Sequence, residues 1–477
     1  MRTVSYEVLA RQADALAQEL AARWGVLPGD RVAWLGFNHP DQIALLFAVA
    51  HLGAILVPLN HRLAPAEWAA VLSDCSPRCL VYDTSFAEAA IPLCALSGGS
   101  ASVALNMLNT QTDHHTESVP GASEADTPVL LVYTSGTTGA PKAAVHTQGN
   151  LLANMAMAAQ VQGLSASDTV LTVLPLFHVG GLCIQTLPAL SVGAHVLLHS
   201  RFDASATLAA IATERPTLTL QVPATLKALA EHPDWMATDL TCLRAVWAGS
   251  SVLPPAPLAA FHARGVPVCN VYGSTETGPF SIALPPECAV SHAGSCGWPA
   301  PGVEVSLRDP LGEAVAPGAV GEICLRAPNV VRRYWPDMPA CDADGFFHSG
   351  DLAQQADDGS YTVVGRAKDM IISGGENIYP AEIENLLLQH PLVIECSVVG
   401  QADARWGEVA VAVLVLQPGA PVGRDWAEPL QRFLDGRLAR YKWPRRWMRV
   451  DALPKTALGK VQKAALKTLL DAETPGV

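Results

Sequence analysis

The sequence has no apolar run that could cross a membrane, because none reaches the roughly 18 residues that a spanning helix needs. Its first ten residues lack the basic-then-apolar order of a secretion signal. Its 11 cysteines include no pair at C-x-x-C spacing, which argues against zinc and redox sites of that kind. We therefore expect reduced thiols in a cytoplasmic protein without a membrane span.

Charge of either sign is scarce, since charged residues make up 16% of the chain and hydrophobic residues 50%. This composition is typical of a globular enzyme and not of a disordered chain. The net charge of −13 argues against nucleic acid as a partner. Residues 437–467 are the exception, with ten basic side chains and one acidic one. Such a run is either a solvated face or a docking face for a polyanionic substrate.

The length of 477 residues predicts two or three domains. A helix is expected from Tyr6 to Leu20, and short apolar runs then alternate with helical patterns as far as residue 273. This alternation is typical of an α/β fold with parallel sheets covered by helices. Hairpin strands are expected from about residue 320, and a compact α+β pattern with a helix at 426–438 follows residue 369. The polar stretch 97–128 is interpreted as a surface excursion.

The most specific segment is Tyr133-Thr-Ser-Gly-Thr-Thr-Gly-Ala-Pro-Lys142, which follows an apolar strand and precedes a helical pattern that starts near Asn150. Glycines there let successive N–H groups turn towards phosphate oxygens, and the hydroxyls and the lysine add donors. It is not a Walker A loop, because the lysine follows proline and Ala143 stands where Ser or Thr would hold magnesium. A flexible turn without a ligand is the alternative reading.

Further segments follow in order along the chain: Tyr272-Gly-Ser-Thr-Glu-Thr277, Ser349-Gly-Asp351, Gly365-Arg-Ala-Lys-Asp369, Ser373-Gly-Gly-Glu-Asn-Ile-Tyr-Pro380 and Leu453-Pro-Lys-Thr-Ala-Leu-Gly-Lys460. With the glycine-rich loop they resemble the ordered motifs of the adenylate-forming superfamily of acyl-CoA synthetases, luciferases and peptide-synthetase adenylation domains. The resemblance covers residues 4–467. It implies a large N-terminal domain of βα-layered sheets with a β-rich subdomain, residues 1–366, and a small mobile C-terminal domain, residues 369–477. The hinge would lie at 365–369.

The resemblance implies a site for ATP and Mg²⁺. Glu276, with Thr137, would hold the metal ion, because Mg²⁺ prefers hard oxygen ligands. Asp351 would accept hydrogen bonds from both ribose hydroxyls, and Lys460 would bring the carboxylate and the α-phosphate together. The nucleotide would also contact Thr134, Ser135, Gly136, Thr137, Thr138, Gly139, Lys142, Gly249, Ser250, Asn270, Tyr272, Gly273, Thr275 and Arg366.

A second set of residues is implied for the acyl group and for coenzyme A. The small domain would rotate about Lys368 and replace the Lys460 face with Gly374 and Gly375, beside which the pantetheine arm would pass. Tyr441 and Arg445 would hold the nucleotide end of coenzyme A. His178 would act as a gate between the two half-reactions, and two consecutive glycines, Gly180 and Gly181, would leave room for a bulky or flat substrate. The carboxylate would lie among His178, Val179, Gly180, Trp247, Gly249 and Gly273, although an ordinary buried strand residue is an equal interpretation of Trp247.

Three functions remain open. The first and favoured one is a free-standing carboxylate–CoA ligase, a monomer or homodimer that binds a small carboxylate, ATP and coenzyme A. The second is an adenylating enzyme that loads a carrier protein, and the third is a non-catalytic binding homologue. The chain is similar to both feruloyl-CoA and fatty-acyl-CoA synthetases. The stretches 199–203 and 230–235 favour a hydroxycinnamic acid such as ferulate over a medium- or long-chain fatty acid.

Overall fold

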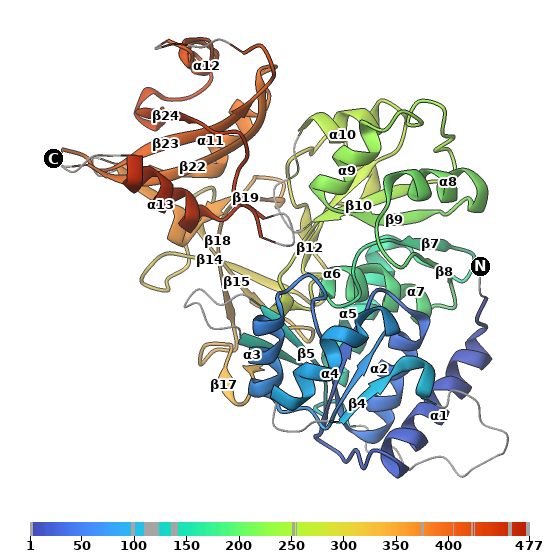
Figure 1. Ribbon diagram of the computed structural model, residues 1–477. Helices are drawn as coiled ribbons and strands as arrows, with labels where there is room; N and C mark the ends of the chain where they lie inside the picture. The colour runs from blue at the N-terminus through green and yellow to red at the C-terminus, as the bar shows by residue number, and fades with distance from the viewer. Residues whose placement is uncertain are drawn as a thin grey trace.

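The computed structural model describes residues 3–96, 101–108, 124–134, 142–249, 253, 255–373, 376–403, 405–420, 423, 425–456 and 460–473. It has a mixed α/β architecture, as the sequence predicts, with several sheets and a C-terminal lobe (Figure 1). None of the helices among the described residues has the length and apolar character that crossing a membrane requires. The described cysteines are free thiols.

The first sheet begins with parallel strands whose two faces are both buried. Alternate residues of β1 point to opposite sides, so Val32 and Trp34 lie in one hydrophobic cluster and Ala33 and Leu35 in another. Helices α1 (Tyr6–Ala22) and α2 (Pro40–Leu52) cover the first face, and α3 (Pro65–Cys75) and α4 (Ala87–Leu96) cover the second. Its strands, in spatial order, are β17 (Met338–Pro339), β16 (Arg333–Tyr334), β6 (Lys142–Thr147), β5 (Pro128–Thr134), β2 (Ile55–Pro58), β1 (Arg31–Leu35), β3 (Cys79–Tyr82) and β4 (Ala101–Ala104).

Two features of this sheet differ from the sequence prediction. The stretch 97–128 is not only a surface excursion, because β4 pairs in parallel with β3 at the sheet edge. The chain after the glycine-rich loop does not pass directly into a helix. It returns first as β6, antiparallel to β5, and only then forms α5 (Gln148–Gln162). The alternating pattern could not show this hairpin, because strands of either direction have the same period of two.

The second sheet also belongs to the large N-terminal part. Its order is β13 (Trp298–Pro299), β12 (Ile282–Ala283), β11 (Val268–Tyr272), β10 (Ala245–Gly249), β9 (Leu218–Gln221), β7 (Thr169–Thr172) and β8 (His195–Leu198). Strands β7, β8, β9, β10 and β11 run parallel, and helices pack around them in one large hydrophobic cluster. The helices of this part include α8 (Ala204–Glu214), α9 (Pro223–Ala230) and α10 (Pro255–His262).

The third sheet is the predicted β-rich subdomain. It is antiparallel, in the order β14 (Glu304–Arg308), β15 (Val320–Arg326), β18 (Phe347–Gln355) and β19 (Tyr361–Arg366). After β19 the chain passes through a 3₁₀ turn, η6 (Ala367–Asp369), and enters a different sheet. Lys368 therefore lies where the chain leaves one sheet for the next, and its side chain is exposed.

The fourth sheet forms the core of the C-terminal lobe, which Figure 1 shows in orange and red beside the rest of the chain. Its strands are β21 (Glu376–Ile378), β20 (Ile371–Ser373), β23 (Gly407–Leu416) and β22 (Val393–Asp403), with β24 (Arg446–Arg449) beside β23. Helices α11 (Pro380–Leu387) and α12 (Glu428–Leu434) pack on one face and α13 (Lys463–Glu473) on the other. The helix expected at 426–438 is shorter than predicted, because the chain turns to extended backbone at Asp435.

Candidate active site

The predicted ribose-binding residues meet at the junction of two sheets. Asp351 on β18 stands opposite Arg366 on β19 in the strand register, and Asp351 Oδ1 lies 2.8 Å from Arg366 Nε. The hydroxyl of Tyr272, from the end of β11, donates to Asp351 Oδ2 at 2.9 Å. Burial, and then the charge of Asp351, raise the pKa of Tyr272 well above its usual value, so the phenol remains a donor. The structure thus brings together three residues that the sequence placed in separate motifs.

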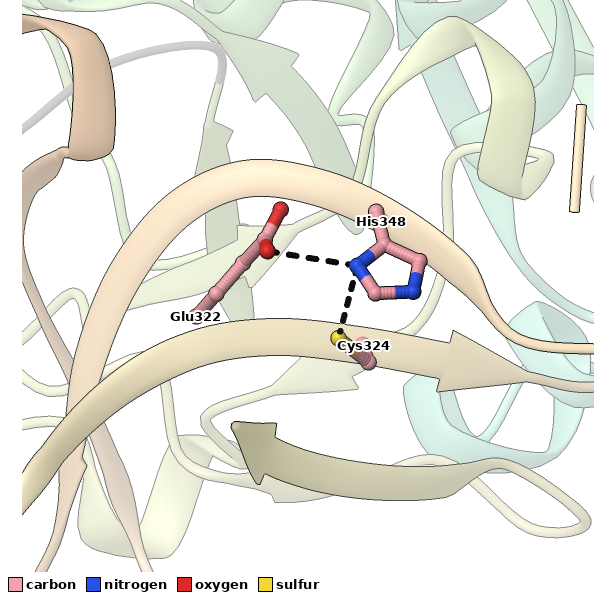
Figure 2. Close-up of side chains that lie close together, drawn as sticks. All are labelled: Glu322, Cys324 and His348. Carbon is pink, nitrogen blue, oxygen red and sulfur yellow. Dashed lines mark hydrogen bonds and ion pairs between the residues drawn. The ribbon is translucent and has the colours of Figure 1, made fainter. Parts of the chain in front are cut away.

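Glu322, Cys324 and His348 form a cluster of side chains (Figure 2) beside the irregular part of β18 that carries Asp351. Glu322 Oε1 accepts a hydrogen bond from the backbone N–H of Gly350 at 2.8 Å, and Glu322 Oε2 lies 3.2 Å from His348 Nδ1. Gly350 has a φ of +69°, a left-handed conformation that glycine adopts without strain. Glu322 therefore connects β15 to the irregular part of β18 between His348 and Asp351.

The same cluster offers three ligand types for a metal ion, since atoms of Glu322, Cys324 and His348 lie within 4.8 Å of one another. However, both ring nitrogens of His348 face carboxylates, with Nε2 3.1 Å from Asp342 Oδ2. Burial lowers the pKa of His348, but the bonds to Asp342 and Glu322 outweigh this effect and raise it above 6.5. Because both ring nitrogens of His348 are engaged by carboxylates, we interpret the cluster as a hydrogen-bonded bridge between β15 and β18.

Lys460 lies within electrostatic reach of the Asp351–Arg366 pair. Lys460 is exposed, but nearby protein atoms partly desolvate its ammonium and lower its pKa, as do the charges of Arg366 and Lys368, whereas the charges of Asp351 and Asp369 raise it. Two hydrogen bonds hold its backbone against Thr456, since Thr456 N–H donates to the Lys460 carbonyl and Lys460 N–H donates to Thr456 Oγ1. The C-terminal lobe thus presents Lys460 to the predicted ribose-binding residues of the N-terminal part.

The predicted phosphate loop connects the paired ends of β5 and β6. Thr134 and Lys142 stand opposite each other in the register, and Thr134 Oγ1 donates to the Lys142 carbonyl at 3.3 Å. The residues between them, including the predicted Ser135, Gly136, Thr137, Thr138 and Gly139, lie outside the described residues. Lys142 Nζ lies 5.7 Å from the ring centroid of Tyr334, a residue that the sequence analysis did not assign to the site.

Glu276 is held by two residues of the segment 331–334. It lies in a 3₁₀ turn, η4 (Thr275–Thr277), directly after β11. Its carboxylate Oε1 accepts from the Tyr334 hydroxyl at 2.9 Å, and its carbonyl accepts from Val331 N–H at 2.8 Å. The following turn is anchored by Asn329, which is fully buried and donates to the carbonyls of Thr277 and Phe280. A half-buried carboxylate with one oxygen committed to a phenol fits a Mg²⁺ ligand, because hard cations take carboxylate oxygens.

Close backbone contacts explain the glycines at the ends of β10 and β11. A Cβ on Gly273 would lie 1.8 Å from the Pro279 carbonyl oxygen, and a Cβ on Gly249 would lie 2.5 Å from that of Val271. Asn270 Nδ2 donates to the Ser295 carbonyl at 3.0 Å, and Thr275 is buried. Ser250 lies outside the described residues.

Trp247, one of the predicted substrate residues, lies in the hydrophobic core of the second sheet. Its side chain is 0% exposed and packs in the core of the second sheet against Phe280, with ring centroids 5.9 Å apart. The alternative interpretation, an ordinary buried strand residue, is therefore favoured. Every side chain of a strand that is covered on both faces is buried, whichever face it points to.

His178 and its neighbours form a tight turn. His178 Nδ1 accepts from Gly180 N–H at 3.0 Å and caps a short helix, α6 (Val179–Gly181). Burial lowers the pKa of His178 to about 4, so the ring is neutral near pH 7. Val179 and Gly180 are buried. A Cβ on Gly181 would lie 2.3 Å from the Pro175 carbonyl oxygen, so backbone packing alone requires a glycine at this position. That the two glycines also make room for substrate stays a prediction.

Tyr441 and Arg445, the two residues predicted to hold the nucleotide end of coenzyme A, have different neighbours. Lys442 is paired with Glu382 at 2.7 Å, and its ammonium lies 5.7 Å from the ring of Tyr441. Arg445 instead stacks on Trp406, with its guanidinium carbon 4.2 Å from the ring centroid. Gly374 and Gly375 lie outside the described residues, but Ser373 before them pairs with Gly407, next to Trp406.

Arg405 stacks on the same ring at 5.0 Å, so Trp406 carries two guanidinium groups. Sequence reasoning missed Trp406, although the sequence Arg405-Trp406-Gly407 offered a signal, because Trp and Arg side chains stack favourably. It also missed Tyr334 and Glu322, for which no local signal exists. Their partners lie 58 and 28 residues away in the chain.

Comparisons with known proteins identify relatives over most of the chain. The family model described as AMP-binding enzyme matches residues 1–335, and the AMP-binding enzyme C-terminal domain matches residues 382–460. An indoleacetate–CoA ligase of Aromatoleum aromaticum is 44% identical, over 99% of this chain and 94% of its own length. A feruloyl-CoA synthase of an Amycolatopsis species is 41% identical, over 97% of this chain and 93% of its own length.

A solved structure extends the likeness to the whole fold. The o-succinylbenzoate CoA synthetase of Bacillus subtilis, in complex with its acyl-adenylate intermediate, matches with a TM-score of 0.86 at 32% identity, covering 100% of this chain and 95% of that one. The two family models together match most of the chain, and the named relatives are matched over nearly their full length. The chain therefore belongs to the family of AMP-binding enzymes and is an AMP-forming acyl-CoA ligase.

Proposed function

We propose that this ligase activates an aromatic carboxylic acid in two half-reactions, and that Lys460 serves the first. In that step a carboxylate oxygen attacks the α-phosphorus of ATP, the bond to the β-phosphate breaks, and pyrophosphate leaves. Two anions must approach each other, so a cation between them lowers the barrier. The observation that carries the proposal is the position of Lys460 within electrostatic reach of Asp351 and Arg366.

The ribose would take the position that the polar side chains around Asp351 define. An ionised carboxylate accepts two hydroxyl donors at once. In the structure the Asp351 oxygens accept from Tyr272 and face Arg366, so the carboxylate is already oriented. Lys142 at the base of the predicted phosphate loop would add a positive charge near the phosphates.

Glu276, with Thr137 of the loop, would hold Mg²⁺. When bound, the metal ion neutralises phosphate charge and orients the phosphate chain. The chain's own contribution is to fix the Glu276 carboxylate through Tyr334 and to keep its backbone in place through Val331.

The second half-reaction would need a different face of the C-terminal lobe. The coenzyme A thiolate attacks the carbonyl carbon of the acyl-adenylate, the carbonyl–phosphate bond breaks, and AMP leaves. We propose that the lobe turns about Lys368, where the chain passes between two sheets, and brings up the loop of Gly374 and Gly375. Arg445, stacked on Trp406 beside the strand that enters this loop, would then hold phosphate groups of coenzyme A.

An aromatic acid is supported by similarity and not by a contact in the structure. The relatives named for indoleacetate and ferulate are 44% and 41% identical to this chain, and both acids carry a flat ring. The neutral His178 ring and the buried Val179–Gly180 turn would border such a ring. This proposal includes ferulate, which the sequence favoured, but does not single it out.

The test is a panel of carboxylates with ATP, Mg²⁺ and coenzyme A, in which pyrophosphate release and thioester formation are measured separately. We expect kcat/KM to be highest for indole-3-acetate, ferulate or a related aryl acid. A long-chain fatty acid as the best substrate would overturn the substrate class. Pyrophosphate release without any thioester from free coenzyme A would favour the loading of a carrier protein.

A further inference from the structure

Tyr334 touches two of the groups that the proposed function assigns to the ATP phosphates. Its hydroxyl donates to Glu276 Oε1 at 2.9 Å, and its ring lies 5.7 Å from Lys142 Nζ. One residue therefore contacts a carboxylate from the end of β11 and an ammonium from the start of β6. These two strands belong to different sheets.

The backbone around Tyr334 is tied to both sheets. Tyr334 on β16 pairs with Ala144 of β6, and Trp335 N–H donates to the Ala143 carbonyl at 2.8 Å. On the other side Val331 N–H donates to the Glu276 carbonyl at 2.8 Å. The phenol is therefore presented from a segment that is fixed at both ends.

The chemistry of the contact suits a permanent donor. A phenol ordinarily has a pKa of about 10, so a tyrosine hydroxyl donates a hydrogen bond near neutral pH. The Tyr334 hydroxyl engages Glu276 Oε1, and none of the described residues donates a hydrogen bond to the other carboxylate oxygen. Partners of this kind orient metal ligands, and their loss typically weakens metal affinity by about 10- to 100-fold.

We propose that Tyr334 is a positioning residue for MgATP: its hydroxyl fixes the Glu276 carboxylate for Mg²⁺, and its ring holds the Lys142 ammonium at the phosphates. This inference rests on the proposed function of Glu276 and Lys142. The two contacts are chemically separable, because phenylalanine keeps the ring and removes only the hydroxyl, whereas leucine removes both.

The experiment measures ATP binding to the full-length protein by calorimetry, with Mg²⁺ and with EDTA. We expect Tyr334→Phe to weaken MgATP binding by about 10-fold and to leave metal-free ATP binding within about 2-fold. We expect Tyr334→Leu to weaken both. Tyr6→Phe is the matched control, since it removes a tyrosine hydroxyl that donates to the Ala194 carbonyl at 2.7 Å, outside the site.

Two results would overturn the inference. Wild-type MgATP affinity in Tyr334→Phe would show that the hydroxyl does not orient the metal ligand. Equal weakening with Mg²⁺ and with EDTA would show that Tyr334 supports the fold of the site and not the metal ion. Tyr334→Phe carries the test even if Tyr334→Leu fails to fold. A wild-type protein that binds no ATP would instead contradict the proposed function.

Discussion

Replacing Lys460 with alanine separates the two half-reactions. At about 4 Å, a single ammonium–phosphate pair near a protein surface contributes about 4 kcal/mol at an effective dielectric constant of about 20. If this contact forms only as the carboxylate approaches the phosphate, its loss slows adenylation by about 10³-fold. Thioester formation from a supplied acyl-adenylate should change little, because the proposed second step uses another face of the lobe.

The assay therefore has two arms, pyrophosphate release from ATP and thioester formation from synthetic acyl-adenylate plus coenzyme A. Lys455→Ala is the matched control, since this neighbouring lysine pairs with Glu395 and a surface ion pair contributes little. Circular dichroism checks that both variants fold. A similar loss in both arms for Lys460→Ala would refute the two-face account.

The pH dependence of the adenylation arm adds a second check on the same lysine. Partial desolvation and the charges of Arg366 and Lys368 lower the pKa of Lys460 below 10.5. Because the ammonium is the useful form, the adenylation rate should fall as pH rises through this lowered pKa. The thioester arm should not show that fall.

Three more predictions concern side chains that hold the backbone around the site in place. Glu322→Ala should raise the KM for ATP by several-fold, because Gly350 N–H loses its acceptor, and Glu322→Gln should restore most of it; steady-state kinetics decide. The raised pKa of His348 implies a contribution to the free energy of unfolding that is fully present below a pH of about 6.5 and is lost as pH rises through the folded-state pKa. The urea midpoint of His348→Gln should therefore fall less over this pH range than the midpoint of the wild type. Asn329→Ala leaves two buried carbonyls without their donor and should lower the free energy of unfolding by about 3 kcal/mol in urea titrations.

Local patterns were sufficient for much of the fold. The strands at Arg31–Leu35 and Ile55–Pro58 are apolar runs, and the helix at Tyr6–Ala22 has an apolar stripe, so sequence period alone predicted them. Strand Ala101–Ala104 was missed because a four-residue strand in a polar stretch has too little period to detect. Strand Lys142–Thr147 was missed because its pairing depends on the hairpin and not on its composition.

The sequence by itself determined the family, the α/β class and the residue types available for the chemistry, because ordered motifs such as Tyr133–Lys142 are local strings. Only the tertiary structure decided which of these residues meet. The register of β18 and β19 sets Asp351 against Arg366, the packing of the lobe brings Lys460 towards them, and Tyr334 reaches Glu276 across 58 residues. Contacts of this kind depend on strand register and on packing between sheets, which no local pattern of side chains encodes.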